Sequence, residues 1–332
     1  MIVTIKKNAL LSNVNALTDD LINQGFELET VRGSSYTVLH ILGDTTGFDA
    51  NKLYAYPCVE RVINIQDPYI KVHRQNHPEK THITVNNIVI GKEPIIIAGP
   101  CSVESEDQIN QVAKLVKNEG AHFLRGGAYK PRTSPYSFQG LKETGLKYLY
   151  NAGKSYNIGV ISEIVNDKDL PLFEQYVDII QVGARNMQNF ELLKALGSSA
   201  KPILLKRGFG NTIEEWLMSA EYIMNHGNKN VILCERGIRT FESYTRATLD
   251  ISSVLAVKAL SHLPVIVDPS HAAGRWDLVS GLTKASLAAG ADGVMIEVHP
   301  NPERALSDGA QSLKPDTFKT LMASIKRLLT VI

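Results

Sequence analysis

Residues 94–100 read PIIIAGP, the first of eight short apolar runs that decide the fold of this chain. Each run is rich in β-branched residues, as expected of a strand buried on both faces, and stretches with helical spacing separate the runs. Eight such units predict a (β/α)8 TIM barrel, whereas a doubly wound open sheet, the alternative, gives no reason for a count of eight. The other runs are AHFLRGG (121–127), IGVISEI (158–164), VDIIQVGA (177–184), KPILLKR (201–207), NVILCER (230–236), LPVIVDPSH (263–271) and DGVMIEVHP (292–300).

The first 65 residues have a different pattern and predict a small separate domain. Strand-like and helical stretches follow one another in the order β-α-β-β-α-β, which is the ferredoxin-like plan. We expect a ferredoxin-like domain over residues 1–65, a polar linker over 66–81 and the barrel over 82–332. The barrel should begin with a hairpin, HITVNNIVIG (82–91), that turns at two asparagines.

The composition excludes several classes of function. Lys and Arg total 35 against 34 Asp and Glu, so we expect no bulk binding to nucleic acid or to an anionic membrane surface. No apolar run approaches the roughly 18 residues of a membrane span, and MIVTIKKNAL (1–10) lacks the apolar segment of a signal peptide, which together predict a cytoplasmic protein. The odd number of widely spaced cysteines (Cys58, Cys101 and Cys234) argues against a disulfide framework.

Ionisable residues stand at the C-terminal ends of the eight runs, where a (β/α)8 barrel builds its active site. Seven of the eight ends carry one within a residue or two, and the first run is followed by a cysteine. Ordinary strand ends would mix such residues with Ser, Thr and Asn, so the pattern predicts a functional site. The residues are Cys101, Arg125, Glu163, Arg185, Lys206, Glu235, Arg236, Asp268, His271 and Glu297.

Five cations at or beside these ends predict an anion site. Unpaired in a partly desolvated mouth, they would repel one another, so a multiply charged anion should belong there. The mixture of Arg forks with Lys point charges suits a ligand that carries both phosphate and carboxylate. The five are Arg125, Lys130, Arg185, Lys206 and Arg236.

The loop KPRTSPYSFQG (130–140) predicts a second anion site. Arg132 and Thr133 are two and three residues beyond Lys130, far enough to hold a separate phosphate. Pro131 and Pro135 restrict the backbone of this loop, which reduces the entropy lost when a ligand orders it.

Four residues of mixed chemistry predict a metal site. A thiolate, an imidazole and two carboxylates suit a divalent first-row ion (Mn, Fe, Co or Zn), and raw affinity does not choose among these. Taken singly, each residue has an ordinary structural explanation, and their expected co-location at one rim is what favours a metal. The four are Cys101, His271, Glu297 and Asp308.

Several ordered motifs, which together span roughly residues 82–325, resemble the 3-deoxy-D-arabino-heptulosonate 7-phosphate (DAHP) synthases, the first enzymes of the shikimate pathway. Residues 1–65 resemble the ferredoxin-like regulatory domain of the type I beta subgroup. The resemblance implies condensation of phosphoenolpyruvate with erythrose 4-phosphate, a homotetramer, and tyrosine or phenylalanine as feedback effectors. The motifs are IIIAGPCSVES, LRGGAYKPRTSPYSFQGL, QVGARNMQNFELL, LLKRGFGNTIEEW, ILCERGIRTFE, VDPSHAAGR and IEVHPNPERALSDGAQSL.

The resemblance also implies residue roles. Phosphoenolpyruvate would be held by Arg125, Lys130, Gly183, Ala184, Arg185, Lys206 and Arg236. Erythrose 4-phosphate would be held by Pro131, Arg132 and Thr133. One divalent metal ion would be bound by Cys101, His271, Glu297 and Asp308.

The catalytic roles leave one choice open. Lys130 is expected to protonate the alkoxide that forms when phosphoenolpyruvate attacks the aldehyde, and either Glu163 or Glu235 to position the water that adds at C2.

The near alternative is 3-deoxy-D-manno-octulosonate 8-phosphate synthase, which uses arabinose 5-phosphate, but Pro131 favours the four-carbon aldehyde. A metal-dependent aldolase would need only one strong phosphate site, and a binding protein would need no metal residues.

Overall fold

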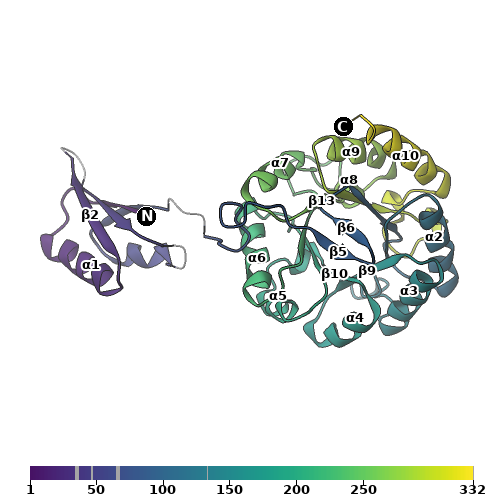
Figure 1. Ribbon diagram of the computed structural model, residues 1–332, viewed down its shortest axis with the longest axis horizontal. Coiled ribbons are helices and arrows are strands. Elements are labelled where there is room, and N and C mark those ends of the chain that lie inside the picture. The colour runs from purple at the N-terminus through teal and green to yellow at the C-terminus, as the bar shows by residue number, and fades with distance from the viewer. Residues whose placement is uncertain (34–36, 46–47, 65–67, 133, 332) are drawn as a thin grey trace. The chain divides into compact units, whose positions relative to one another are not determined.

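The computed structural model describes residues 1–33, 37–45, 48–64, 68–132 and 134–331. The chain divides into two compact units, Met1–Ile70 and Lys71–Ile332 (Figure 1).

The first unit is a four-stranded antiparallel sheet whose buried side chains pack against one α-helix and one 3-10 helix. The strand order is β2-β3-β1-β4. Val3, Leu17 and Leu39 are at most 1% exposed in the core between sheet and helix. This arrangement confirms the predicted ferredoxin-like plan, with the second helix realised as a 3-10 helix. The elements are β1 (Ile2–Ile5), α1 (Leu11–Asn23), β2 (Glu27–Arg32), β3 (Thr37–Leu42), η1 (Ala50–Ala55) and β4 (Val59–Ile63).

The second unit is built on a closed barrel of eight parallel strands, and this confirms the predicted TIM barrel. Neighbouring strands follow chain order around the barrel, and the last strand pairs with the first, as in Glu297 opposite Gly99. The strands are β7 (Ile95–Gly99), β8 (Phe123–Arg125), β9 (Gly159–Ile164), β10 (Ile179–Val182), β11 (Ile203–Lys206), β12 (Val231–Glu235), β13 (Val265–Val267) and β14 (Gly293–Glu297).

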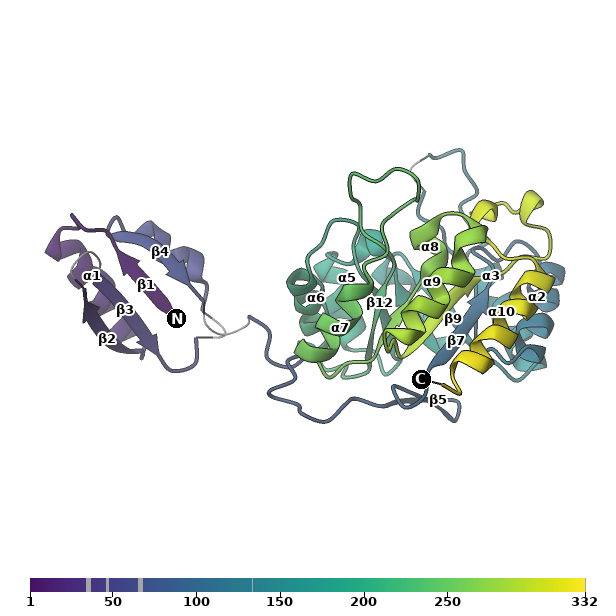
Figure 2. The same cartoon turned by 90° about the horizontal axis from the view of Figure 1, so that it is seen from above.

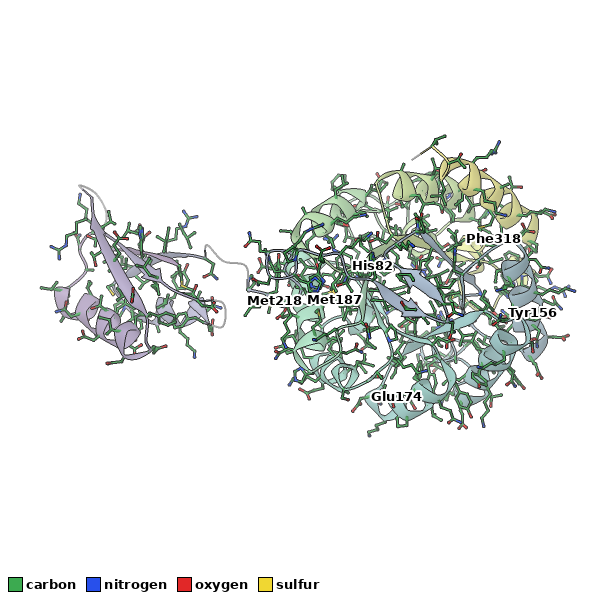
Figure 3. All side chains as sticks on the ribbon, in the orientation of Figure 1. His82, Tyr156, Glu174, Met187, Met218 and Phe318 are labelled. Carbon is green, nitrogen blue, oxygen red and sulfur yellow. The ribbon has the colours of Figure 1, made fainter. Side chains whose placement is uncertain are left out.

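Helices surround the barrel (Figure 1), and many of their apolar side chains are buried. Local capping fixes where they begin: Ser105 accepts from the Gln108 N–H at the start of α2, and Thr212 forms a reciprocal capping box with Glu215 at α6. Phe318 of α10, labelled in Figure 3, is fully buried. Among the described residues, no helix is long and apolar enough to cross a membrane. The helices are α2 (Glu106–Asn118), α3 (Glu143–Ser155), α4 (Leu170–Tyr176), α5 (Phe190–Gly197), α6 (Ile213–Asn225), α7 (Ile251–Leu260), α8 (Pro269–Ala273), α9 (Trp276–Ala288) and α10 (Pro315–Leu328).

A hairpin closes the N-terminal end of the barrel. Strands β5 (Ile83–Val85) and β6 (Ile88–Ile90) are joined by Asn86 and Asn87, whose φ angles of 47° and 67° give the left-handed turn that asparagine tolerates. Ile83 and other apolar residues of the hairpin pack into the barrel interior. Figure 2 shows β5 at one end of the barrel and long loops at the other. The functional loops therefore lie at the C-terminal end of the strands.

The chain is attached to the barrel from Lys71 onward. The backbone N–H groups of Lys71 and Val72 each donate to the Glu221 carboxylate of α6 at 3.0 Å. Part of the expected linker, 66–81, is thus held by the barrel. The predicted boundaries at 65/66 and 81/82 stay predictions.

Candidate active site

A cavity of about 300 Å³ opens among the loops that follow the C-terminal ends of the barrel strands. Residues from distant parts of the sequence meet there. Cys101, Arg125, Glu235 and Glu297 are buried and do not line it, and Thr133 lies outside the described residues. The predicted residues that line it are Lys130, Pro131, Arg132, Glu163, Gly183, Ala184, Arg185, Lys206, Arg236, His271 and Asp308.

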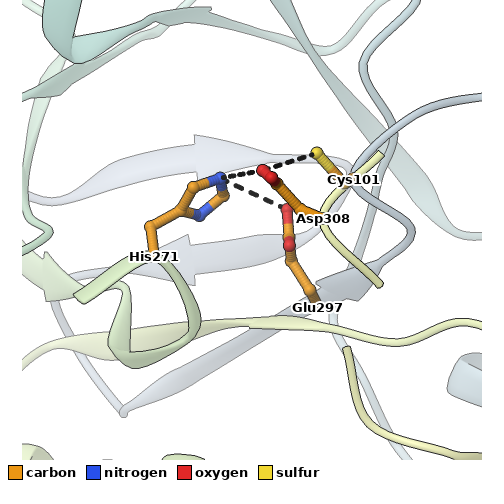
Figure 4. A group of neighbouring side chains, drawn as sticks. All are labelled: Cys101, His271, Glu297 and Asp308. Atoms are coloured by element: carbon orange, nitrogen blue, oxygen red, sulfur yellow. Dashed lines mark hydrogen bonds and ion pairs between the residues drawn. The ribbon is translucent and has the colours of Figure 1, made fainter. Parts of the chain in front are cut away.

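The four predicted metal residues lie together, with His271 and Asp308 at the cavity and Cys101 and Glu297 buried behind them. One ligand atom from each lies within 4.8 Å of the other three, and Figure 4 shows the imidazole of His271 facing both carboxylates. His271 Nε2 is 3.3 Å from Glu297 Oε1 and 3.9 Å from Asp308 Oδ2. Cys101 Sγ is 3.3 Å from Asp308 Oδ2. A single small ion would have one donor from each residue within reach.

His271 is oriented by its neighbour Asp268. Its Nδ1 donates to Asp268 Oδ2 at 2.7 Å, so Nε2 faces the other metal residues. Burial lowers the pKa of His271, although Asp268 and Glu297 oppose this shift, so the neutral, metal-binding form is favoured near pH 7. Burial by itself would raise the pKa of Asp268, but His271 and Lys206 hold it well below its usual range.

The thiol of Cys101 is protonated at neutral pH without a bound cation. Burial and then the charge of Glu297 raise the pKa of Cys101 to about 11, although Lys130 opposes them. Lys130 Nζ lies 3.1 Å from both the Cys101 carbonyl oxygen and Sγ. A metal ion would have to displace the thiol proton, as is usual for cysteine ligands.

Asp308 presents an ionised carboxylate from an unusual backbone conformation. Its φ of 51° and ψ of 35° lie in the left-handed region, which aspartate enters more readily than most residues. Burial alone would raise the pKa of Asp308, but the charges of His271, Arg246 and Lys130 outweigh it and lower the pKa to about 2.

This set of donors fits a divalent first-row transition ion. It offers sulfur, a nitrogen held in place by a carboxylate, and two carboxylate oxygens, whereas Mg²⁺ and Ca²⁺ prefer oxygen alone. The hydrogen bond from His271 to Asp268 is the kind of outer contact that accompanies metal-binding histidines.

The prediction of five unpaired cations was wrong for two of them. Arg125 Nη1 donates to Glu297 Oε1 at 2.7 Å, and Lys206 Nζ donates to Asp268 Oδ2 at 2.5 Å, so both cations have buried partners. The excess positive charge that calls for an anion is therefore smaller than the sequence suggested. Within the described ranges, no carboxylate lies within 4.0 Å of Lys130, Arg185 or Arg236.

A phenylalanine lies among three arginines at the cavity. The guanidinium carbons of Arg236, Arg239 and Arg185 are 4.6, 4.9 and 5.4 Å from the centre of the Phe209 ring. Cations over an aromatic ring are attracted by its quadrupole. Phe209 therefore offsets part of the repulsion among these three guanidinium groups.

The two glutamates left open by the sequence have different surroundings. Glu235 is fully buried, and its oxygens accept from Gly237 N at 2.6 Å and from Arg207 Nη1 at 3.0 Å. Glu163 lines the cavity, and its Oε2 accepts from Gln181 Nε2 at 3.1 Å. The Glu235 carboxylate thus binds Gly237 and Arg207, whereas the Glu163 side chain lies beside the space that a ligand would fill.

Arg132 has an unused donor in the cavity wall. Its Nε donates to the Phe138 carbonyl at 3.0 Å, which fixes the side chain, while its Nη2 is buried and has no hydrogen-bond partner among the described residues. Buried donors are rarely left unpaired, so an anionic ligand is a natural partner for Nη2.

A larger cavity, of about 600 Å³, lies at the opposite end of the barrel beside Asn86, Lys117 and Tyr150. It contains none of the predicted site residues. Chemistry, and not volume, therefore identifies the smaller cavity as the candidate active site.

Comparison with known proteins agrees with this geometry. Residues 70–331 match the DAHP synthetase I family, and residues 1–67 match the DAHP synthase ferredoxin-like domain. The chain belongs to the DAHP synthetase I family. Within this family, a Thermotoga maritima protein named phospho-2-dehydro-3-deoxyheptonate aldolase is 50% identical over 329 residues, which are 99% of this chain and 97% of that protein.

Two solved structures are similar to this chain, and a relative with a different name is more distant. The crystal structure of the Thermotoga maritima DAHP synthase superimposes with a TM-score of 0.96 at 49% identity and covers 99% of this chain and 97% of its own. A truncated form from the same organism has a TM-score of 0.73 at 52% identity and covers 78% of this chain and 95% of its own. A Francisella tularensis 2-dehydro-3-deoxyphosphooctonate aldolase is only 29% identical, over 72% of this chain and 92% of that protein. The octulosonate alternative is therefore not favoured.

Sequence reasoning missed several residues that surround this DAHP synthetase family site. Asp268 was counted as a strand end but received no role. Arg246, Gln311 and Phe209 lie outside the strand ends, and only proximity in space connects them to the site.

Proposed function

We propose that this chain condenses phosphoenolpyruvate with erythrose 4-phosphate and water to give DAHP and inorganic phosphate. Family membership supports the reaction class. The observation that carries the proposal is the meeting, at one cavity, of cations without acid partners, an Arg132 nitrogen that has no partner among the described residues, and two of the four metal residues, His271 and Asp308. A substrate pair with two phosphates, a carboxylate and an aldehyde matches these groups.

The cavity supports a division into two anion sites. Phosphoenolpyruvate would lie against Arg185, Lys206 and Arg236, with Lys130 beside it, the backbone of Gly183 and Ala184 near its carboxylate, and Arg125 behind. The erythrose phosphate would lie against Pro131 and Arg132, together with Thr133. Lys130 would stand between the two sites.

Cys101, His271, Glu297 and Asp308 would hold one divalent ion, Mn, Fe, Co or Zn. Lewis-acid polarisation of the aldehyde oxygen is the chemistry that a bound ion supplies. When phosphoenolpyruvate C3 attacks the aldehyde carbon, negative charge would develop on the aldehyde oxygen, and Lys130, whose Nζ is 3.1 Å from Cys101 Sγ, would deliver a proton to it. Glu163 is the better candidate to position the water that adds at C2, since Glu235 is occupied by Gly237 and Arg207.

Phosphate release tests the reaction and its specificity. The enzyme with added Mn²⁺ should release phosphate from phosphoenolpyruvate much faster with erythrose 4-phosphate than with arabinose 5-phosphate. A preference for arabinose 5-phosphate would establish the octulosonate reaction instead. Release without either aldose would indicate a phosphatase.

A change at Cys101 tests the metal site. Cys101→Ala should remain folded yet lose turnover and bound metal, a chelator should have the same effect on the wild type, and added Mn²⁺ should restore only the wild type. Cys234→Ala, which removes another buried free thiol, is the matched control. Near-normal activity of Cys101→Ala with ordinary metal content would show that the proposed ligands are wrong.

Regulation, assembly and location are further proposals that rest on the resemblance. We infer feedback inhibition by tyrosine or phenylalanine through residues 1–65, a homotetramer and a cytoplasmic location. The match of residues 1–67 to a ferredoxin-like domain of DAHP synthases supports the first. Removal of residues 1–65 should leave an active enzyme that neither amino acid inhibits. A full-length enzyme indifferent to both would contradict the regulatory role.

A further inference from the structure

The buried amide of Gln311 connects two of the metal residues. Gln311 is 2% exposed, and its Nε2 donates to Glu297 Oε2 at 2.6 Å. Its Oε1 accepts from Arg246 Nη1 at 2.9 Å. Arg246 Nη1 is in turn 3.4 Å from Asp308 Oδ1. The contacts therefore run from Glu297 through Gln311 and Arg246 to Asp308.

The orientation of this amide is fixed by its partners. An ionised carboxylate only accepts hydrogen bonds and a guanidinium only donates them, so Gln311 must present nitrogen to Glu297 and oxygen to Arg246. Glu297 Oε1, the atom nearest His271 Nε2, is left to the metal position and to Arg125. One glutamine thus holds the outer oxygen of Glu297 while the inner oxygen faces the site.

The backbone holds both ends of this chain of contacts in place. The Leu313 N–H donates to the Glu297 carbonyl at 2.8 Å, which brings the loop with Gln311 back to the end of β14. The Arg246 N–H donates to the Ala273 carbonyl at 3.1 Å, which attaches Arg246 to α8, the helix that carries His271. A Cβ on Gly274 would lie 2.4 Å from the Cβ of Arg246, so the two segments are in close contact.

We propose that Gln311 and Arg246 form a bridge that positions Glu297 and Asp308 for the metal ion. This proposal rests on the metal site assigned above and adds two positioning residues to it. Outer hydrogen bonds of this kind fix the direction of carboxylate ligands and typically contribute 10- to 100-fold in metal affinity. Arg246 also lines the substrate cavity, whereas Gln311 does not. The two residues should therefore differ in their effect on substrate binding.

Metal affinity, measured by chelator competition with Zn²⁺ on the full-length protein and without substrate, tests the bridge. Gln311→Leu should raise the Zn²⁺ dissociation constant roughly 10- to 100-fold, while KM for both substrates at saturating metal stays within about twofold. Gln311→Met, which keeps the length of the side chain, should behave in the same way and serves if the leucine variant does not fold. Asn228→Leu, which removes another buried amide far from the site, should leave the constant unchanged.

Arg246 supplies the second arm of the experiment. Arg246→Leu should weaken Zn²⁺ binding and also raise KM for at least one anionic substrate. Because both residues act in one bridge, the Gln311→Leu, Arg246→Leu double variant should lose less affinity than the product of the two single losses. A Gln311→Leu protein that binds Zn²⁺ as the wild type does, or losses that multiply, would overturn the bridge.

The outcomes separate this proposal from the metal site itself. If Cys101→Ala binds Zn²⁺ as the wild type does, the metal site is wrong and the bridge falls with it. If Cys101→Ala loses Zn²⁺ and Gln311→Leu does not, the metal site stands and the bridge alone is wrong.

Discussion

His271 donates from Nδ1 to Asp268 at 2.7 Å, and the same carboxylate accepts from the His271 backbone N–H at 2.9 Å and from Lys206 at 2.5 Å. Asp268 thus caps α8, orients the imidazole and holds a cavity lysine. One buried acid therefore links the proposed metal site to the proposed phosphoenolpyruvate site.

Asp268→Asn should weaken metal binding without unfolding the protein. Asparagine keeps the shape but removes the charge that fixes the His271 tautomer, so the metal dissociation constant should rise roughly 10- to 100-fold. KM for phosphoenolpyruvate should change as well, because Lys206 loses its partner. Chelator competition and steady-state kinetics measure the two effects. Asp277→Asn, at an exposed ion pair with Arg275, is the control, and equal behaviour of the two variants would contradict the role of Asp268.

Changes at two residues of the loop 130–140 should affect different kinetic constants, KM in one case and kcat in the other. Arg132→Ala should raise KM for erythrose 4-phosphate roughly 10- to 150-fold, which corresponds to about 1.5–3 kcal/mol for a charged hydrogen bond, and should affect phosphoenolpyruvate far less. Lys130→Ala should instead reduce kcat, since the proposed proton donor is lost. Initial rates with each substrate varied in turn measure both constants. If the Arg132 change raised the two KM values equally, the division into two anion sites would be refuted.

The position of Phe209 predicts that KM for phosphoenolpyruvate depends on the aromatic ring. Phe209→Leu keeps an apolar side chain but removes the quadrupole beside Arg185 and Arg236, so KM for phosphoenolpyruvate should rise roughly 3- to 10-fold. Phe209→Tyr should stay close to the wild type. Phe190→Leu, which alters a ring packed on Tyr222 of α6, should have no effect on KM. Similar values for the leucine and tyrosine variants would show that the ring only fills space.

Most of the fold could be predicted from the sequence because each strand of a parallel barrel is buried on both faces. Such strands appear as apolar runs, and the eight runs became β7 to β14. The hairpin was legible for a local reason, since Asn86 and Asn87 adopt positive φ. The prediction of the second helix in the first unit was less exact, because Ala50–Ala55 form a 3-10 helix.

The sequence predicted site residues only where they follow the C-terminal ends of the strands, because these ends meet at one end of the barrel. The grouping of Cys101 and His271 followed from strand ends. The pairing of Arg125 with Glu297 did not, because β8 and β14 are separated by β7 and only the side-chain directions bring the two charges to 2.7 Å. The contacts of Gln311 were equally hidden, since they depend on how one loop returns to β14.

Glu104 predicts how the stability of the loop that carries Asp308 depends on pH. Its Oε1 accepts from the Leu306 N–H at 2.8 Å, and its Oε2 is 3.3 Å from His299 Nε2. Burial alone would raise the pKa of Glu104, but His299 and the Leu306 N–H outweigh it, and the pKa lies below its ordinary value. A carboxyl with a lowered pKa stabilises the fold above the unfolded-state pKa, and this contribution disappears as the pH falls through the folded-state pKa.

Glu104→Gln should therefore lower Tm at pH 7 by roughly 1–4 °C, given that about 1 kcal/mol shifts a protein of this size by a few degrees. The difference from the wild type should shrink as the pH falls below about 4.5, because the protonated wild-type carboxyl then resembles the amide. Thermal unfolding at several pH values measures both. Glu303→Gln, which alters an exposed pair with Lys314 in the same loop, should change Tm little at any pH. A Glu104→Gln difference that is the same at pH 7 and pH 4 would show that the carboxylate charge does not hold this loop.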